Sequence, residues 1–247
     1  MMSPAAWWQL EPRAAALVRD FLFHPAVYVH PDRLADVWPG GADLQPTRGA
    51  DDAALSRALM QVFEIPTHVE LDAQHPLHQV ALLPYEGLAR LARRVELECL
   101  GRRLRRVILR SELQALAGRL NEDDWRVVMA GGIDGGRSQH ALDHAREPVD
   151  GENPAEAASM PMQELAHQLD TLGWQVLEQA FSQLPAGLRS RAVLKLPMRP
   201  NPSNPDASAS KALVERVYAA CADEWDADWH EAWLALAEHQ RSGMGAH

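Results

Sequence analysis

Apolar residues recur at steps of three and four along much of the chain, which is the spacing of one face of an amphipathic α-helix. The stretch 51–63 shows this clearly, because Leu55, Leu59 and Val62 follow one another at such steps. The same spacing predicts helices over 51–63, 162–181 and 211–240, while the prolines that flank them predict shorter helices over 14–23 and 32–38. Gly173 is a weak point in one of these helices. In the last helix, tryptophans at steps of four drift by about 40° each, which predicts a bend or break near Asp226.

The central block 84–131 contains little glycine and has no proline after Pro84, so it is expected to be rich in helix. Leu88, Leu91 and Val95 share one helical face, whereas Leu97 and Leu104 lie roughly opposite. The apolar stripe therefore changes sides near Gly101. Either a helix breaks at this glycine, or one long helix is buried on both faces.

Two helix-capping patterns follow in the same block. The sequence SELQ at 111–114 fits a capping box in which Ser111 caps a helix. NEDD at 121–124 repeats the pattern, with Asn121 as the cap and acidic residues in the first turn. We expect Trp125, Val128 and Met129 to turn inward from this second helix.

The segments between these helices lack helical periodicity. A mobile loop is predicted at about 131–161, which is rich in glycine, acidic and small residues, and a polar linker at about 198–210. Short extended segments are expected near 65–72 and at 192–197, where AVLKLP alternates like a strand but is too short to pair alone. The pattern as a whole predicts an all-α protein with a single helical domain over 1–247.

Composition narrows the functional class. The formal net charge is −10, from 34 acidic and 24 basic residues, which argues against a general nucleic-acid binder. No secretory signal and no run of about 20 apolar residues is apparent, so a cytoplasmic protein is expected. Cys99 and Cys221 lack metal-site or redox spacing and are interpreted as buried apolar thiols.

Histidines provide the candidate metal ligands. They fall in three groups: His24 with His30, His75 with His78, and the run of His140, Asp143 and His144. No HExxH, GxSxG or phosphate-binding motif accompanies them, so no catalytic residue, metal or cofactor is assigned. A metal-dependent hydrolase that uses a His/Asp cluster stays open as the alternative function. His24 and His30 each precede a proline, which fixes an extended backbone and aims both rings from a rigid turn.

Charge is segregated along the chain. Eight arginines and two glutamates between Arg90 and Arg110 give a local charge of +6, whereas 211–239 has a net charge of −5. A solvated helix face and a DNA-binding helix are the alternatives, although the overall charge opposes DNA. Arginine and tryptophan are enriched at the energetic centres of protein interfaces. The candidate partner interface therefore consists of Arg102, Arg103, Arg105, Arg106, Trp225, Trp229 and Trp233.

The stretch FLFHPAVYVHPDRL at 21–34 resembles the N-terminal signature of the SctK (YscK) family of bacterial type III secretion systems. The helical run at 88–131 is similar to that family's central helices, and VLKLP at 193–197 resembles its late L-x-L-P element. The chain departs from the family most at the 131–161 loop and in its acidic C-terminal part.

The resemblance implies a non-enzymatic, mostly helical adaptor of the cytoplasmic sorting platform beneath the injectisome. Such an adaptor bridges the cytoplasmic domain of SctD and the pod protein SctQ, and indirectly reaches SctL and the ATPase SctN. It lies at the cytoplasmic face of the inner membrane without inserting into it, and it binds no nucleic acid. In this reading the two His-Pro pairs form a corner on which apolar side chains pack, namely Phe21, Phe23, Val27, Tyr28 and Leu34.

Overall fold

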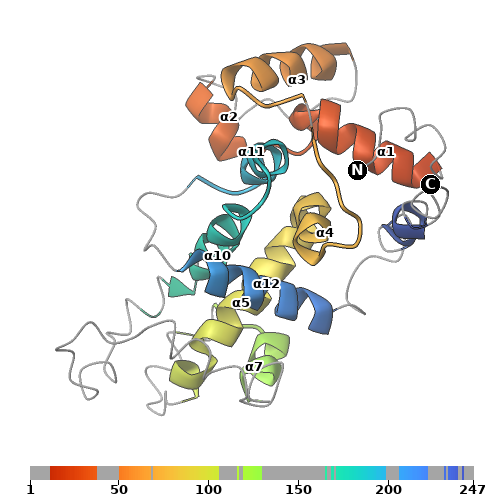
Figure 1. Cartoon of the computed structure of the whole chain (residues 1–247). Helices are drawn as coiled ribbons and strands as arrows, with labels where there is room; N and C mark the ends of the chain where they lie inside the picture. Colours follow the sequence, from red (N-terminus) through yellow and green to blue (C-terminus); the bar gives the residue numbers. More distant parts are fainter. Residues whose placement is uncertain are drawn as a thin grey trace. The chain divides into compact units, whose positions relative to one another are not determined.

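The computed structural model confirms an all-α fold in the part of the chain that it describes. The described residues are 12–37, 50–67, 69–105, 116, 119–129, 165, 168–169, 171–198, 206–221, 231, 233–238 and 241. Within them there are helices and no strand (Figure 1). The helices, labelled as in Figure 1, are α1 (Pro12–Phe23), the 3₁₀ turn η2 (Pro25–Val27), α2 (Pro31–Val37), α3 (Ala50–Val62), α4 (Pro76–Leu82), α5 (Tyr85–Leu104), α7 (Glu122–Met129), α10 (Leu172–Phe181), α11 (Ala186–Leu194) and α12 (Ala207–Ala220).

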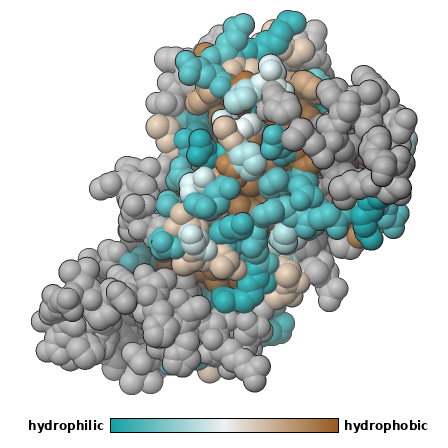
Figure 2. Space-filling model, in the orientation of Figure 1, coloured by the Kyte–Doolittle hydropathy of each residue, from teal (hydrophilic) through white to brown (hydrophobic). Residues whose placement is uncertain are grey.

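Contacts group the chain into two compact units. The first contains Met1–Leu88, Ala180–Asn201 and Cys221–His247, and the second contains Ala89–Gln179 and Pro202–Ala220. The single helical domain expected over 1–247 stays a prediction. None of the described helices is both long enough and apolar enough to span a bilayer. In the view of Figure 2, hydrophilic residues border the hydrophobic ones on the described surface.

The first unit is organised around α1, η2, α4 and α11. The turn η2 contacts both α1 and α3, and α4 contacts both α1 and α11. A small core beside η2 joins Ala26, Leu34 and Leu59, all at most 5% exposed. The helix α4 is almost completely covered, because Leu77, Val80, Ala81 and Leu82 are all buried.

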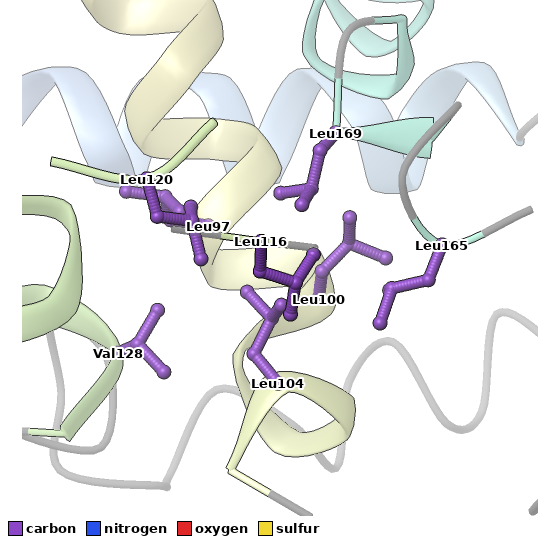
Figure 3. Close-up of a cluster of buried hydrophobic side chains, with 8 residues drawn as sticks. All are labelled: Leu97, Leu100, Leu104, Leu116, Leu120, Val128, Leu165 and Leu169. Atoms are coloured by element: carbon purple, nitrogen blue, oxygen red, sulfur yellow. The ribbon is translucent and has the colours of Figure 1, made fainter. Parts of the chain in front are cut away.

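The core of the second unit lies along α5. One cluster of buried side chains, drawn in Figure 3, consists of Leu97, Leu100, Leu104, Leu116, Leu120, Val128, Leu165 and Leu169. The helix α5 continues through Gly101 to Leu104. Leu91 and Val95 on one side and Leu97 and Leu104 on the other are all buried. The structure thus answers the question left open by the sequence, in favour of one long helix buried on two faces.

The second unit also contains the predicted asparagine cap. Asn121 Oδ1 accepts a hydrogen bond from the Asp124 N–H at 2.8 Å, and Asp124 Oδ2 accepts from the Asn121 N–H at 3.1 Å. This is a reciprocal capping box with aspartate in place of glutamate. Val128 is buried and Trp125 is partly buried, but Met129 is 68% exposed, so its predicted inward position is wrong. Ser111 and the loop at 131–161 lie outside the described residues.

The helix predicted over 162–181 is not continuous. Leu169 and Thr171 lie in turns, and α10 begins at Leu172. The Leu169 carbonyl accepts a hydrogen bond from Arg93 Nη1 at 2.9 Å. In a continuous helix this carbonyl would accept a hydrogen bond from the main-chain N–H four residues later. Here a side chain from α5 binds the carbonyl instead.

The extended segment predicted at 192–197 is also wrong in part. Residues 192–194 complete α11, and Lys195 and Leu196 follow in tight turns with N–H bonds to the carbonyls of Ala192 and Val193. The strand-like alternation misleads because most of this segment is buried on every side. Near 65–72 the described residues form neither helix nor strand, as expected.

The last predicted helix begins earlier and ends sooner than its pattern indicates. The helix α12 begins at Ala207, inside the linker predicted at 198–210, because Asp206 caps it: Asp206 Oδ1 accepts from the Ala209 N–H at 2.7 Å. The helix ends at Ala220, and Asp226, where a bend was expected, lies outside the described residues.

Candidate functional site

The two His-Pro pairs form the predicted corner, and histidine serves as a helix cap within it. The helix α1 ends at Phe23, His24-Pro25 begins η2, and His30-Pro31 begins α2. His30 Nδ1 accepts a hydrogen bond from the Asp32 N–H at 3.2 Å, and His24 Nδ1 lies 3.0 Å from Asp20 Oδ1. Both imidazoles are hydrogen-bonded nearby, as the sequence reading expected.

The packing predicted for this corner is only partly correct. Phe21 and Leu34 are buried, and the Tyr28 hydroxyl donates to the Phe21 carbonyl at 2.7 Å. Phe23 is 52% exposed and Val27 is 43% exposed, which contradicts the expectation for both. Phe23 lies about 200° around the helix from Phe21, so both side chains cannot face the same core.

The VLKLP segment packs directly against this corner through a buried lysine. Lys195, which is 2% exposed, donates from Nζ to the carbonyls of Ala81 at 2.8 Å and Leu83 at 2.9 Å. Its ammonium also lies over two aromatic rings of the corner, with 4.6 Å to the Phe21 centroid and 5.1 Å to the Tyr28 centroid. Burial lowers the pKa of Lys195 to about 7.

A second buried cation reinforces the same junction. Arg191 is 1% exposed, and its guanidinium donates to the carbonyl of Leu22 at 3.0 and 3.1 Å, of Gly187 at 2.8 Å and of Pro66 at 2.9 Å. Leu22 lies in the last turn of α1, where carbonyls lack helical partners. Burial lowers the pKa of Arg191.

Main-chain and surface contacts complete the junction. The His30 N–H donates to the Leu194 carbonyl at 2.8 Å, and Arg33 Nε donates to the Leu196 carbonyl at 3.2 Å. Two motifs about 160 residues apart in sequence therefore form one packed structure. Four of its polar side chains hydrogen-bond to main-chain groups, which is a structural role: Lys195, Arg191, Arg33 and His30.

The arginine-rich segment serves partly as an internal brace of the second unit. Arg93 Nη1 lies 2.6 Å from Glu96 Oε2, and Arg93 Nη2 lies 3.0 Å from Asp124 Oδ2. Arg93 also donates to the carbonyls of Leu169 and Arg119. Partial burial is the largest single influence and lowers the pKa of Arg93, but the combined hydrogen bonds and charges of Asp124 and Glu96 outweigh it and raise this pKa. One arginine thus joins α5 to α7 and to two turns.

The predicted partner-interface residues are described unevenly. Arg105 is half-buried and its Nη1 donates to the Val128 carbonyl at 2.7 Å. Arg102 and Arg103 belong to α5, while Arg106, Trp225 and Trp229 lie outside the described residues. Trp233 is only 3% exposed and lies in the core of the first unit, so burial opposes its assignment to the partner interface, which stays a prediction.

The described cysteines and histidines form no metal-ligand group. Among the described residues, three or more His, Cys, Asp or Glu side chains nowhere gather around one point. His140, Asp143 and His144 lie outside the described residues. Cys221 is buried, and burial together with Glu98 and Glu96 raises the pKa of Cys99 to about 12, which keeps that thiol protonated.

Comparison with known proteins identifies the family. Residues 17–224 match the family model described as YOP proteins translocation protein K (YscK). The chain belongs to the YscK family. The SctK (YscK) resemblance of the corner, the central helices and VLKLP is therefore confirmed, since the match includes all three.

Two curated members of the YscK family are similar to this chain, each named Yop proteins translocation protein K. They come from Yersinia pseudotuberculosis serotype I (strain IP32953) and from Yersinia enterocolitica, and each is 32% identical over 107 residues. The aligned region is 43% of this chain and 50% of each relative, so the chain spans about half the length of the curated relatives it matches. No solved structure matches.

Proposed function

We infer that this protein is a non-enzymatic adaptor of a type III secretion sorting platform, and that it bridges the cytoplasmic domain of SctD and the pod protein SctQ. Through SctQ it reaches SctL and the ATPase SctN. It works in the cytoplasm, at the inner face of the inner membrane. The observation that carries this inference is membership of the YscK family over residues 17–224, because relatives of the chain are named for Yop translocation.

The chemistry of the described residues supports a scaffold. Lys195 and Arg191 donate to main-chain carbonyls, and His30 accepts from a main-chain N–H. An adaptor must present its binding surfaces in a fixed geometry, because preorganised surfaces lose less conformational entropy on binding. Buried cations that fix chain segments far apart in sequence suit this requirement.

The proposed contact for an acidic partner surface is the cluster of Arg102, Arg103, Arg105 and Arg106. Its support is charge density, since four arginines fall within five positions. Arg105 donates to the Val128 carbonyl, so its replacement would disturb the second unit itself. Arg102 and Arg103 are therefore the better positions for a test, and Trp225 and Trp229 are further proposed contacts.

Co-purification with the SctD cytoplasmic domain and with SctQ from the same organism tests the function. The adaptor role requires that both proteins are retained, singly and together. The double charge reversal R102E/R103E should weaken retention of one partner. The matched control is R57E/R189E, which reverses two exposed arginines on α3 and α11 and should leave retention unchanged.

Two outcomes would contradict these proposals separately. If neither SctD nor SctQ is retained by the folded wild-type protein, the bridging function is wrong. If both are retained equally by wild type and by folded R102E/R103E, only the arginine contact is wrong.

A further inference from the structure

Two histidines shape the loop that precedes α4. His75 is the N-cap of α4, and its Nδ1 accepts a hydrogen bond from the Leu77 N–H at 3.2 Å. The buried His78 accepts from the Asp72 N–H through Nδ1 at 3.0 Å. The two rings stack with centroids 4.7 Å apart and an angle of 23° between planes. Both Nδ1 atoms act as acceptors, so each ring is neutral and carries its proton on Nε2.

The same loop holds the C-terminal helical segment, residues 233–238. Gln74 Nε2 donates to the Ala237 carbonyl at 3.3 Å, and the Gln74 N–H donates to Asp72 Oδ1 at 2.8 Å. Trp233 and Leu236 are buried, whereas Leu234 is 45% exposed, so one face of the segment packs inside the first unit. The segment lies beyond the 17–224 family match. The segment therefore lies outside the region that identifies the family.

We propose that His75 and His78 form an acid-sensitive clasp that releases the C-terminal helical segment when the imidazoles are protonated. Protonation places an N–H on each Nδ1, which then faces the main-chain N–H of Leu77 or Asp72, donor against donor. Two imidazolium rings at the stacking distance also repel each other. The loop must leave its present geometry, and Gln74 loses its position opposite Ala237.

Other charged groups on neighbouring elements favour or oppose the protonation of these two histidines. They are Glu70 and Asp72 in the loop, Arg19 and Asp20 on α1, Arg189, Arg191 and Lys195 on or just after α11, and Glu231, Glu238 and Arg241 in the C-terminal part. Arg191 is a buried cation and Lys195 becomes one as the pH falls below about 7, and both oppose further positive charge in this unit. The Asp72 carboxylate, whose Oδ1 accepts from the Gln74 N–H, attracts an imidazolium formed in the same loop. The clasp does not depend on the adaptor role.

Hydrogen exchange followed by mass spectrometry tests the clasp in the full chain. Protection factors, normalised to unstructured peptide at the same pH, are compared at about pH 7.5 and about pH 5.5, on either side of the ordinary histidine range. Protection of 72–78 and of 233–238 should fall together at the lower pH, by at least about fivefold, since a buried acceptor is lost at each histidine. Unchanged protection, or a fall in the loop alone, would overturn the proposal.

Asparagine variants separate protonation from general acid sensitivity. H75N/H78N keeps an oxygen acceptor close to each Nδ1 position but cannot titrate, so the joint fall in protection of both segments should shrink to the smaller part that Lys195 contributes in every variant. H24N, at a histidine paired with Asp20 elsewhere, should behave as wild type. A fall in H75N/H78N as large as that in wild type would refute the clasp.

A second variant tests the link between loop and segment. Gln74 is exposed, and Q74A removes the donor to Ala237 without touching either ring. Protection of 233–238 should fall already at about pH 7.5, by roughly threefold or more, while 75–78 stays protected. Full protection of the segment in Q74A would show that Gln74 does not transmit the change. If H75N/H78N does not fold, the single variant H75N is measured instead. The loss of protection at the lower pH should then be smaller in H75N than in wild type.

Discussion

The ammonium of Lys195 lies over the ring of Phe21, with Nζ 4.6 Å from the ring centroid. This contact joins the His-Pro corner to the end of α11, and the carbonyls of Ala81 and Leu83 complete the surroundings of the ammonium. Burial nevertheless dominates its proton equilibrium, because the pKa of Lys195 falls from 10.5 to about 7. Stability must therefore depend on pH in a window above neutrality.

The direction of that dependence follows from proton counting. Between about pH 7 and the ordinary lysine pKa of 10.5, Lys195 binds more protons in the unfolded chain than in the folded one. The free energy of unfolding therefore rises with pH. Cys99, with its raised pKa, acts in the opposite direction once the unfolded thiol ionises near pH 9.0. From about pH 7 to 9 we expect the free energy of unfolding to rise by about 2 kcal/mol.

Urea denaturation at both pH values measures this rise. The variant K195M keeps an apolar stem but cannot titrate, so its free energy of unfolding should lose most of the increase. A wild-type protein that is equally stable or less stable at the higher pH would show that Lys195 stays charged in the folded state.

Arg191 offers a test of the same junction that does not depend on pH. R191K keeps the charge but removes the planar fork that reaches Leu22, Gly187 and Pro66 together. At least one buried carbonyl then loses its donor, and we expect the free energy of unfolding to fall by about 2–4 kcal/mol. R189K changes an exposed arginine on the same helix and should stay within about 0.5 kcal/mol of wild type. Equal effects of the two substitutions would refute the structural role of Arg191.

Two glycines in helices of the second unit are predicted to respond in opposite ways to alanine. A Cβ at Gly173 would lie 2.0 Å from the Ala92 carbonyl oxygen, so α10 and α5 would have to separate. We expect G173A to destabilise the protein by about 3 kcal/mol or more. At Gly101 the nearest atom would be Arg105 Nη1 at 3.4 Å, the end of a flexible side chain, so G101A should stabilise by up to about 1 kcal/mol. Thermal or urea unfolding of both variants checks the sign, and a stable G173A would contradict the close packing.

These cases show what the sequence could and could not predict. The end of α1 before His24 follows from Pro25 alone, because a local steric rule decides it. The burial of Lys195 could not be predicted from its neighbours in sequence, since its partners Phe21 and Ala81 are more than 100 residues away in the chain. Gly101 and Gly173 likewise look alike in a helical pattern, and only the packing of Ala92 against one of them distinguishes their roles.

Histidine as a helix cap escaped the sequence reading for a related reason. Serine, threonine, aspartate and asparagine are the residue types expected at this position. Yet His30-Pro31 and His75-Pro76 begin α2 and α4 in the same way, each with Nδ1 3.2 Å from the N–H of the second helical residue. A His-Pro pair at the start of an apolar periodic run is a usable signal, because proline is favoured at the first helical position.

His30 caps α2 through its Nδ1 atom. H30A removes the acceptor for the Asp32 N–H, and we expect the free energy of unfolding to fall by about 1 kcal/mol. H30N supplies an equivalent oxygen and should recover most of this loss, because asparagine is a good cap. Urea denaturation of both variants measures the difference, and elemental analysis of the same samples should find no stoichiometric zinc or iron in any of them. If H30N is as unstable as H30A, or if metal is present in wild type and lost in H30A, then His30 acts through its imidazole as a ligand rather than through the cap.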